Sequence, residues 1–196
     1  SFLARCIRAG FVFRRSSQTG VPDGSMKRNS GRRMARKEKM MRRQDREIRD
    51  REDILDIMKR AKVVRLAFND DPVPYVIPLN FGLETRDEKI ILWMHGAMEG
   101  RKYSFLGQEA AFEMDIENGY LYAASRKSCT MPYESIIGRG IFEEVTEEQE
   151  KLQGLDFLMR HAHPEGWEYQ QPMVKVTRVF CLRVTDFTAK RREPKP

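Results

Sequence analysis

Cysteine is scarce in this sequence, and long apolar runs are absent from it. Only three cysteines, Cys6, Cys129 and Cys181, occur in 196 residues, and none belongs to a Cys-x-x-Cys pair or a Cys/His cluster. This usage predicts neither a disulfide framework nor a structural zinc site, and it favours a reducing, cytoplasmic location. No apolar run approaches the roughly 20 residues that a spanning helix needs, so we expect no membrane partner.

Several catalytic motifs are also missing. The chain has no Walker loop, GxGxxG, HExxH or GxSxG pattern, so kinases, Rossmann dehydrogenases, zincins and serine hydrolases lack their usual marks. Cys129 has no histidine beside it to act as a base, which argues against a nucleophilic cysteine. His161 and His163 have no carboxylate or cysteine ligand set nearby, so we predict no metal site.

Acidic residues are nearly absent from the start of the chain. Residues 1–43 hold 13 of the 36 Lys/Arg residues but only two of the 29 acidic ones, so the net charge of +7 belongs to this segment. The remainder has four more acidic than basic residues. Such a domain is poorly suited to follow a phosphate backbone, and a nucleic-acid partner is therefore not expected.

Residues 1–40 are interpreted as a basic leader that needs a partner to become ordered. Three origins are consistent with it: an expression tag or upstream-translated leader, a native basic arm, or an Arg-rich transit peptide. The chain does not begin with Met, and Met26, Met34, Met40 and Met41 are all conceivable starts. The expected domain covers residues 41–191, and residues 192–196 form a basic tail.

The rest of the chain alternates short apolar runs with turn residues. An amphipathic helix is expected over residues 44–62, a short one over 103–107, and another through residue 160 from a capping box that starts at Thr146. The expected strands are residues 63–68, 73–81, 90–95, 110–116, 135–145 and 174–185, and residues 82–89 are expected to form a turn. Prolines at positions 72, 74 and 78 confine parts of the second strand to an edge or a bulge. Strands joined by short turns predict a mainly β fold with peripheral helices, an antiparallel sheet that closes as a barrel.

One stretch, residues 74–102, carries the strongest chemical signal. Gly100-Arg101-Lys102 is expected at a helix start, where free amides and two cations favour an anion such as a phosphate, although such a triplet also fits a solvated surface. His95 ends an apolar strand, where it is either a structural residue or a proton donor to a bound substrate. Asn80 is a polar amide among apolar neighbours and therefore needs a partner.

These residues resemble the pyridoxamine 5′-phosphate oxidase-like, FMN-binding split-barrel family, and within it the nitroimidazole-resistance (Nim-type) flavoprotein branch. The motifs that carry the resemblance are Met41-Arg42-Arg43-Gln44-Asp45-Arg46-Glu47-Ile48, Pro74-Tyr75-Val76-Ile77-Pro78-Leu79-Asn80-Phe81-Gly82, His95-Gly96-Ala97, Glu99-Gly100-Arg101-Lys102 and Tyr133-Glu134-Ser135-Ile136-Ile137-Gly138.

The resemblance implies a six-stranded antiparallel split β-barrel and a homodimer with FMN at the subunit interface. By this resemblance, Arg101 and Lys102 hold the phosphate, and His95, Gly96 and Ala97 lie beside the flavin ring. Tyr75, Val76, Ile77 and Pro78 line the ring, and Ser135 comes from a later strand, whereas Asn80 joins the predicted cofactor-binding residues on its own chemistry. The C-terminal Lys190-Arg191-Arg192 is not clearly a set of ligands for a substrate phosphate, so pyridoxamine phosphate oxidation is disfavoured.

The first hypothesis is therefore an FMN-dependent oxidoreductase that takes electrons from a reduced nicotinamide and reduces a small electrophilic ring such as a nitroaromatic. His95 is the candidate catalytic residue, and Trp167 and Tyr169 are expected to cover the site from a loop. The alternative is a non-catalytic split barrel that holds flavin or haem, with His95 as an axial ligand to the haem iron.

Overall fold

The computed structural model describes residues 41–163, 165, 168 and 174–193. The predictions made for residues 1–40, for Trp167 and Tyr169, and for residues 194–196 lie outside this part of the chain. The helices of the described part, α helices and short 3-10 helices together, are η1 (Gln44–Arg46), α2 (Arg51–Arg60), η2 (Arg101–Phe105), η3 (Ala124–Arg126) and α3 (Glu148–Ala162). The strands are β1 (Glu47–Ile48), β2 (Val64–Phe68), β3 (Tyr75–Leu79), β4 (Gly82–Arg86), β5 (Lys89–Gly96), β6 (Glu109–Glu117), β7 (Leu121–Ala123), β8 (Ser128–Thr130), β9 (Tyr133–Val145) and β10 (Arg178–Arg192).

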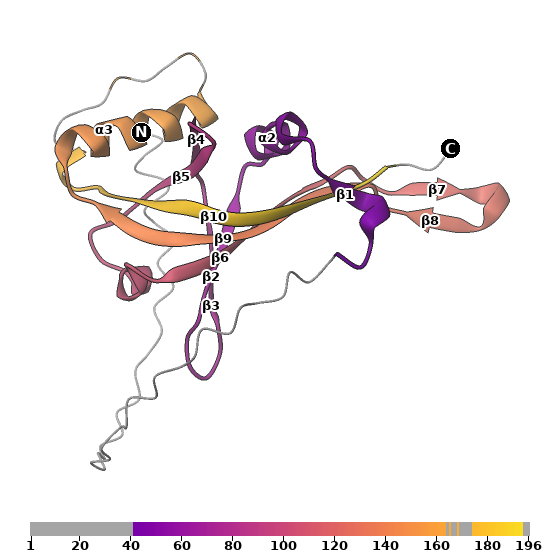
Figure 1. The fold of residues 1–196 in the computed structure, drawn as a ribbon, viewed down its shortest axis with the longest axis horizontal. Coiled ribbons are helices and arrows are strands. Elements are labelled where there is room, and N and C mark those ends of the chain that lie inside the picture. Colours follow the sequence, from indigo (N-terminus) through magenta and orange to yellow (C-terminus); the bar gives the residue numbers. More distant parts are fainter. Residues whose placement is uncertain (1–40, 164, 166–167, 169–173, 194–196) are drawn as a thin grey trace, which may run out of the picture. The chain divides into compact units, whose positions relative to one another are not determined.

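Most of these strands form one antiparallel sheet in the order β3-β2-β6-β9-β10-β5-β4, with β1 added along β10 (Figure 1). The long strands β9 and β10 lie at its centre and pair from Val145–Val179 to Tyr133–Arg192. The predicted mainly β class is confirmed. The sheet has eight strands rather than six, because the expected turn at residues 82–89 contains the strand β4 and Ile48 lies in β1 rather than in a helix.

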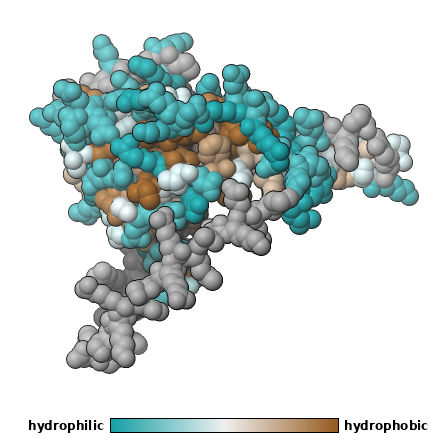
Figure 2. Space-filling model, in the orientation of Figure 1, coloured by the Kyte–Doolittle hydropathy of each residue, from teal (hydrophilic) through white to brown (hydrophobic). Residues whose placement is uncertain are grey.

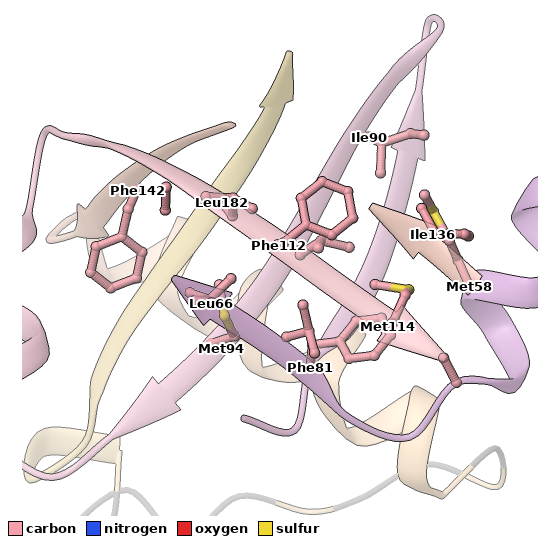
Figure 3. Close-up of a cluster of buried hydrophobic side chains, with 14 of the residues drawn as sticks. Met58, Leu66, Phe81, Ile90, Met94, Phe112, Met114, Ile136, Phe142 and Leu182 are labelled. Atoms are coloured by element: carbon pink, nitrogen blue, oxygen red, sulfur yellow. The ribbon is translucent and has the colours of Figure 1, made fainter. Parts of the chain in front are cut away.

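The main core fills the inside of this curved sheet, and α2 packs against it. It is built from aliphatic, methionine and phenylalanine side chains that are almost completely buried and come from nearly every strand (Figure 3). Figure 3 labels Met58, Leu66, Phe81, Ile90, Met94, Phe112, Met114, Ile136, Phe142 and Leu182 among them. A second buried cluster, around Trp93 and Cys181, lies under α3. The alternation of apolar and polar residues along the strands therefore places one face of the sheet in the core.

The first helix is shorter than predicted. The prediction of a helix over residues 44–62 is wrong for its first part, since α2 begins at Arg51 and Ile48 pairs with Ala189 of β10. Asp50 explains the boundary, because its side chain accepts a hydrogen bond of 2.9 Å from the amide of Asp53 and so caps the helix.

The predicted capping box at Thr146 is also wrong, because α3 starts one residue later than expected. Glu147 is the N-cap, and its carboxylate accepts hydrogen bonds from the amides of Gln149 and Glu150 at 3.0 and 2.7 Å. The last strand runs to Arg192 rather than residue 185, because its second half pairs with β9 along its whole length. Pro78 lies in β3, which ends the strand order, so the prediction of an edge strand is confirmed.

A buried acid joins the C-terminal strand to α2. Glu134 of β9 is buried and accepts ion pairs from Arg60 at 2.8 Å and Arg191 at 2.7 Å. Burial by itself would raise the pKa of Glu134, but the hydrogen bonds from Arg191 and Arg60 outweigh it and lower that pKa below its usual 4.5. Glu134 therefore stays ionised in the folded protein at neutral pH.

We expect Glu134→Gln to lower the free energy of unfolding by about 1–3 kcal/mol at pH 7, because two arginines lose their shared carboxylate. A lowered folded-state pKa adds stability above the unfolded-state pKa, and this stability is lost as the pH falls through the folded-state value. Urea unfolding between pH 3 and pH 7 measures the difference. The gap between wild type and variant should shrink toward acid pH, and a gap that stays constant with pH would contradict the ionised pair.

The surface is mostly hydrophilic, with apolar side chains gathered in the centre of the face shown in Figure 2. The β7–β8 hairpin extends away from the main sheet (Figure 1), and β7 and β8 pair only with each other. Tyr120 and Tyr122 are 78% and 72% exposed there. Within the described residues, neither α2 nor α3 has the length and apolar character to cross a membrane.

Candidate functional site

The candidate site lies where β5 ends and η2 begins. His95 and Gly96 are the last residues of β5 and pair with Val179 and Arg178 at the start of β10. The chain then leaves the sheet and returns at Gly100, from which η2 starts with Arg101 and Lys102. Three segments that are distant in sequence, the ends of β5 and β9 and the start of β10, therefore meet beside η2. We call this region the basic corner, and it contains His95, Gly96, Lys102, Tyr103, Glu144 and Arg178.

Lys102 is the cation of the basic corner for which the described residues supply no ion-pair partner. Its Nζ lies 4.5 Å from the centroid of the Tyr103 ring and 5.5 Å from that of Phe180. Burial, and then the charge of Arg178, lower the pKa of Lys102. Among the residues that the structure describes, no carboxylate forms an ion pair with its ammonium group. A half-buried ammonium without a counter-ion favours the binding of an anion such as a phosphate.

Arg178 is fixed in place by an acid on the neighbouring strand. Its guanidinium donates hydrogen bonds of 2.6 and 2.5 Å to the carboxylate of Glu144 and one of 3.3 Å to the carbonyl of Met98. Its Cζ lies 3.7 Å from the centroid of the Tyr103 ring. Sequence reasoning missed Glu144 and Arg178, because only the pairing of β9 with β10 brings them together.

His95 lies half-buried beside Lys102. Burial is the main cause that lowers the pKa of His95, and the positive charge of Lys102 adds to it. The imidazole is therefore neutral at physiological pH. A neutral imidazole can accept a proton, donate its single N–H, or bind a metal ion through its free nitrogen. No group of three or more His, Cys, Asp or Glu side chains that could hold a metal ion occurs in the described part of the chain.

Arg101 points to a different neighbour from Lys102. Its guanidinium pairs with Asp70, lies 5.1 Å from the centroid of the Tyr75 ring, and is 63% exposed. Tyr75 in turn stacks on Phe105 with ring centroids 5.5 Å apart. The two residues of the predicted phosphate pair thus differ, because Arg101 already has an acidic partner and Lys102 has none among the residues that the structure describes.

Asp70 is expected to compete with a bound phosphate for Arg101. We expect Asp70→Asn to strengthen the binding of a phosphate-bearing ligand about 2- to 10-fold, because the substitution removes a negative charge next to the anion. Fluorescence titration with FMN, compared with riboflavin as the ligand without a phosphate, measures the effect. Weaker binding of FMN to the variant would mean that Asp70 orients Arg101 for the phosphate.

The predicted residues of β3 alternate between two environments. Tyr75 and Ile77 are half-buried against the core, whereas Val76 is 56% exposed and Pro78 is exposed. Asn80, which was predicted to need a partner, donates from Nδ2 to the carbonyl of Lys62 at 3.3 Å. Of this set, Tyr75 contacts Arg101, the neighbour of Lys102 in sequence.

Ser135 lies far along the sheet from His95, and the register Pro78–Arg65–Glu113–Ile137 places Pro78 of β3 near the same end. Val145, at the other end of β9, pairs with Val179, which pairs with His95. Ten residues of strand separate Ser135 from Val145, about 30 Å at the usual rise of a strand. A single chain therefore brings His95, Gly96, Ala97 and Lys102 together and leaves Ser135 outside that group.

The curved antiparallel sheet, with the basic corner where β5 ends, has the architecture of the split-barrel class of proteins. The sequence pattern of the pyridoxamine 5′-phosphate oxidase family matches residues 50–191, so the chain belongs to this family. The match includes the basic corner and all the predicted site residues.

Solved structures agree with this assignment, whereas no curated protein matches the chain. A candidate 5-nitroimidazole antibiotic resistance protein from Bacteroides thetaiotaomicron is 28% identical with a TM-score of 0.64, over 74% of this chain and 86% of that one. The FAD and heme binding protein from Mycobacterium smegmatis is 22% identical with a TM-score of 0.65, over 77% and 75% of the two chains. The flavocytochrome Anf3 from Azotobacter vinelandii is 19% identical with a TM-score of 0.64, over 80% and 73%. The last two likenesses concern the fold alone.

Proposed function

We propose that this protein is an FMN-dependent oxidoreductase that takes electrons from a reduced nicotinamide and reduces a small electrophilic ring such as a nitroaromatic. The observation that carries the proposal is the half-buried Lys102 ammonium, which has no counter-ion in the described part of the chain and lies next to a neutral His95, in a chain of the pyridoxamine 5′-phosphate oxidase family. The 28% identical structure, described as a candidate 5-nitroimidazole resistance protein, supports the choice of acceptor.

Lys102 of the basic corner and the neighbouring Arg101 fit the phosphate end of FMN. Lys102 supplies an uncompensated positive charge, and Arg101 lies next to it in sequence with a guanidinium that Asp70 shares. One phosphate with a charge between −1.5 and −2 at neutral pH, as is usual for a phosphate monoester, matches two such cations. Flavin, when bound, supplies the hydride chemistry.

The ring side of the site is assigned from the resemblance to the flavin-binding split barrels. It puts His95, Gly96 and Ala97 beside the flavin ring when Lys102 holds the phosphate. His95, as a neutral imidazole, donates a hydrogen bond from its single N–H to the acceptor that stacks on the ring. Val76, exposed on β3, and Tyr75, Ile77 and Pro78 line the ring through backbone and side chain.

A homodimer is part of the proposal, because the predicted cofactor residues do not converge in one chain. Ser135 lies about 30 Å along the sheet from His95 by the rise of a strand. In a two-fold dimer, the Ser135 end of one sheet can meet the His95 end of the other at each of two equivalent sites. Light scattering coupled to size-exclusion chromatography tests the dimer independently of cofactor binding.

Absorbance and anaerobic reduction test the proposal directly. We expect the purified protein to keep a flavin band after FMN is added and unbound FMN is removed by gel filtration. NADH or NADPH should bleach this band, and a nitroimidazole should restore it. A protein fraction without a flavin band after this step would contradict the proposal. Bound FMN that neither nicotinamide reduces would contradict the catalytic part alone.

The second candidate function is a non-catalytic carrier of flavin or haem. The low pKa of His95 favours it, because a neutral imidazole is the form that ligates haem iron. Two solved structures of the same fold are described as an FAD and heme binding protein and a flavocytochrome. A Soret band after haem addition that disappears in His95→Ala would favour this function.

A further inference from the structure

Tyr103 contacts both cations of the basic corner, Lys102 and Arg178, and the backbone that follows β5. Its hydroxyl donates a hydrogen bond of 2.5 Å to the carbonyl of Ala97, on the predicted ring side of the site. Its ring carries Lys102 Nζ at 4.5 Å and Arg178 Cζ at 3.7 Å from the centroid. The ring also meets Phe180 edge to face, with centroids 5.9 Å apart and an interplanar angle of 81°. The packing on Phe180 fixes the ring plane on which the two cations lie.

Two cations on one ring need an explanation, because like charges repel. The carboxylate of Glu144 compensates Arg178, but the described residues give Lys102 no acid. The attraction of an ammonium to an aromatic face then opposes the tendency of a flexible lysine stem to turn into water. Tyr103 is therefore the contact that keeps Lys102 inside the corner when no anion is bound.

Gly96 shows how closely these groups approach the end of β5. A Cβ atom at this position would lie 2.7 Å from Lys102 Nζ and 2.8 Å from the Tyr103 hydroxyl. The space that a side chain would fill on β5 is thus occupied by the lysine and the tyrosine. Tyr103 therefore holds both the Lys102 ammonium group and the backbone of residues 96–97.

We propose that Tyr103 is a positioning residue that links the phosphate-binding Lys102 to the ring-side segment Gly96-Ala97. Its aromatic face holds Lys102, and its hydroxyl holds the Ala97 carbonyl, so a ligand with a ring at one end and a phosphate at the other meets a preformed site. This inference rests on the proposed function, since FMN is such a ligand.

Substitutions of Tyr103 separate its two roles. Tyr103→Leu removes both contacts, and we expect the ratio of FMN affinity to riboflavin affinity to fall about 10-fold, because Lys102 is no longer held for the phosphate. Tyr103→Phe keeps the ring, so this ratio should stay at its wild-type value. The loss of the Ala97 hydrogen bond should then weaken both ligands equally, about 2- to 10-fold.

Two further variants show that the effect passes through Lys102. In a Lys102→Met background, Tyr103→Leu should not change the affinity ratio further, because the cation it positions is gone. Tyr120→Leu, on the exposed hairpin, is the matched control and should leave the ratio unchanged. Thermal melting of each variant identifies any that fails to fold.

A readout without flavin tests the positioning directly. The groups that face Lys102 are His95 of β5, Tyr103 of η2, and Arg178 of β10 with its partner Glu144 of β9. NMR titration of 13C-methylated lysines should find a lowered pKa for Lys102 in wild type and in Tyr103→Phe, and a higher pKa in Tyr103→Leu, where the ammonium group turns into water.

The outcomes keep the two proposals apart. An unchanged Lys102 pKa in a folded Tyr103→Leu variant overturns the positioning role, as do additive effects of Tyr103→Leu and Lys102→Met on the affinity ratio. If wild type binds neither FMN nor riboflavin, the proposed function fails, while the NMR titration still decides whether Tyr103 holds Lys102.

Discussion

Replacing Lys102 by methionine is expected to weaken FMN binding about 10- to 100-fold, because a charge-assisted hydrogen bond to a phosphate contributes about 1.5–3 kcal/mol. Methionine retains most of the apolar stem that packs on Tyr103 and Phe180, so the fold and the ring side should change little. Riboflavin has no phosphate, and its affinity for the variant should stay within about threefold of wild type. Flavin fluorescence titrations of both ligands give the two affinities.

The paired measurement separates a lost phosphate contact from a damaged site. Lys59→Met, at an exposed position of α2, is the matched control for a lost positive charge and should leave both affinities unchanged. Equal losses for FMN and riboflavin in Lys102→Met would mean that the lysine supports the ring. Unchanged binding of both ligands would place the phosphate elsewhere on the protein.

The proximity of His95 and Lys102 could be predicted from the sequence because the two residues are close together along the chain. A strand that ends in histidine and a Gly-Arg-Lys at a helix start are only a few residues apart, so the chain itself keeps them close. The partners Glu144 and Arg178 were missed for the opposite reason. They belong to strands separated by α3, and only the register of β9 against β10 puts their side chains in reach of each other.

The error in the first helix and the missed strand β4 have separate local causes. Ile48 continues the apolar spacing of α2, so periodicity alone extends the helix backwards, whereas Asp50 ends it by binding the amide of Asp53. Strand β4 was missed because its sequence, Gly-Leu-Glu-Thr-Arg, is mostly polar and runs into the turn residues Asp87 and Glu88. The residues therefore resemble a turn rather than a strand. Glu84, although acidic, is buried there because it accepts a hydrogen bond of 2.8 Å from Trp93 Nε1.

Gly82→Ala is expected to lower the free energy of unfolding by about 1–3 kcal/mol, the usual cost of inserting a methyl group into packed structure. The reason is the close approach of α3 to β4 (Figure 1). A Cβ atom on Gly82 would lie 2.3 Å from the backbone nitrogen of Leu158 and 2.3 Å from the carbonyl carbon of Phe157. Backbone atoms cannot rotate away, so the helix itself has to shift.

A shift of α3 is resisted by a second close contact, between α3 and β5. Gly154 of α3 faces Trp93, whose Cε3 would lie 2.4 Å from a Cβ there, and the Trp93 side chain is held by Glu84. Chemical unfolding of Gly82→Ala measures the cost, with Thr85→Ala, at an exposed position of the same strand, as the control within about 0.5 kcal/mol of wild type. A Gly82→Ala variant as stable as the control would mean that α3 lies farther from β4 than these distances require. Gly82 pairs with Trp93, two residues before His95, so FMN affinity measured on the same variant shows whether a shift of α3 reaches the basic corner.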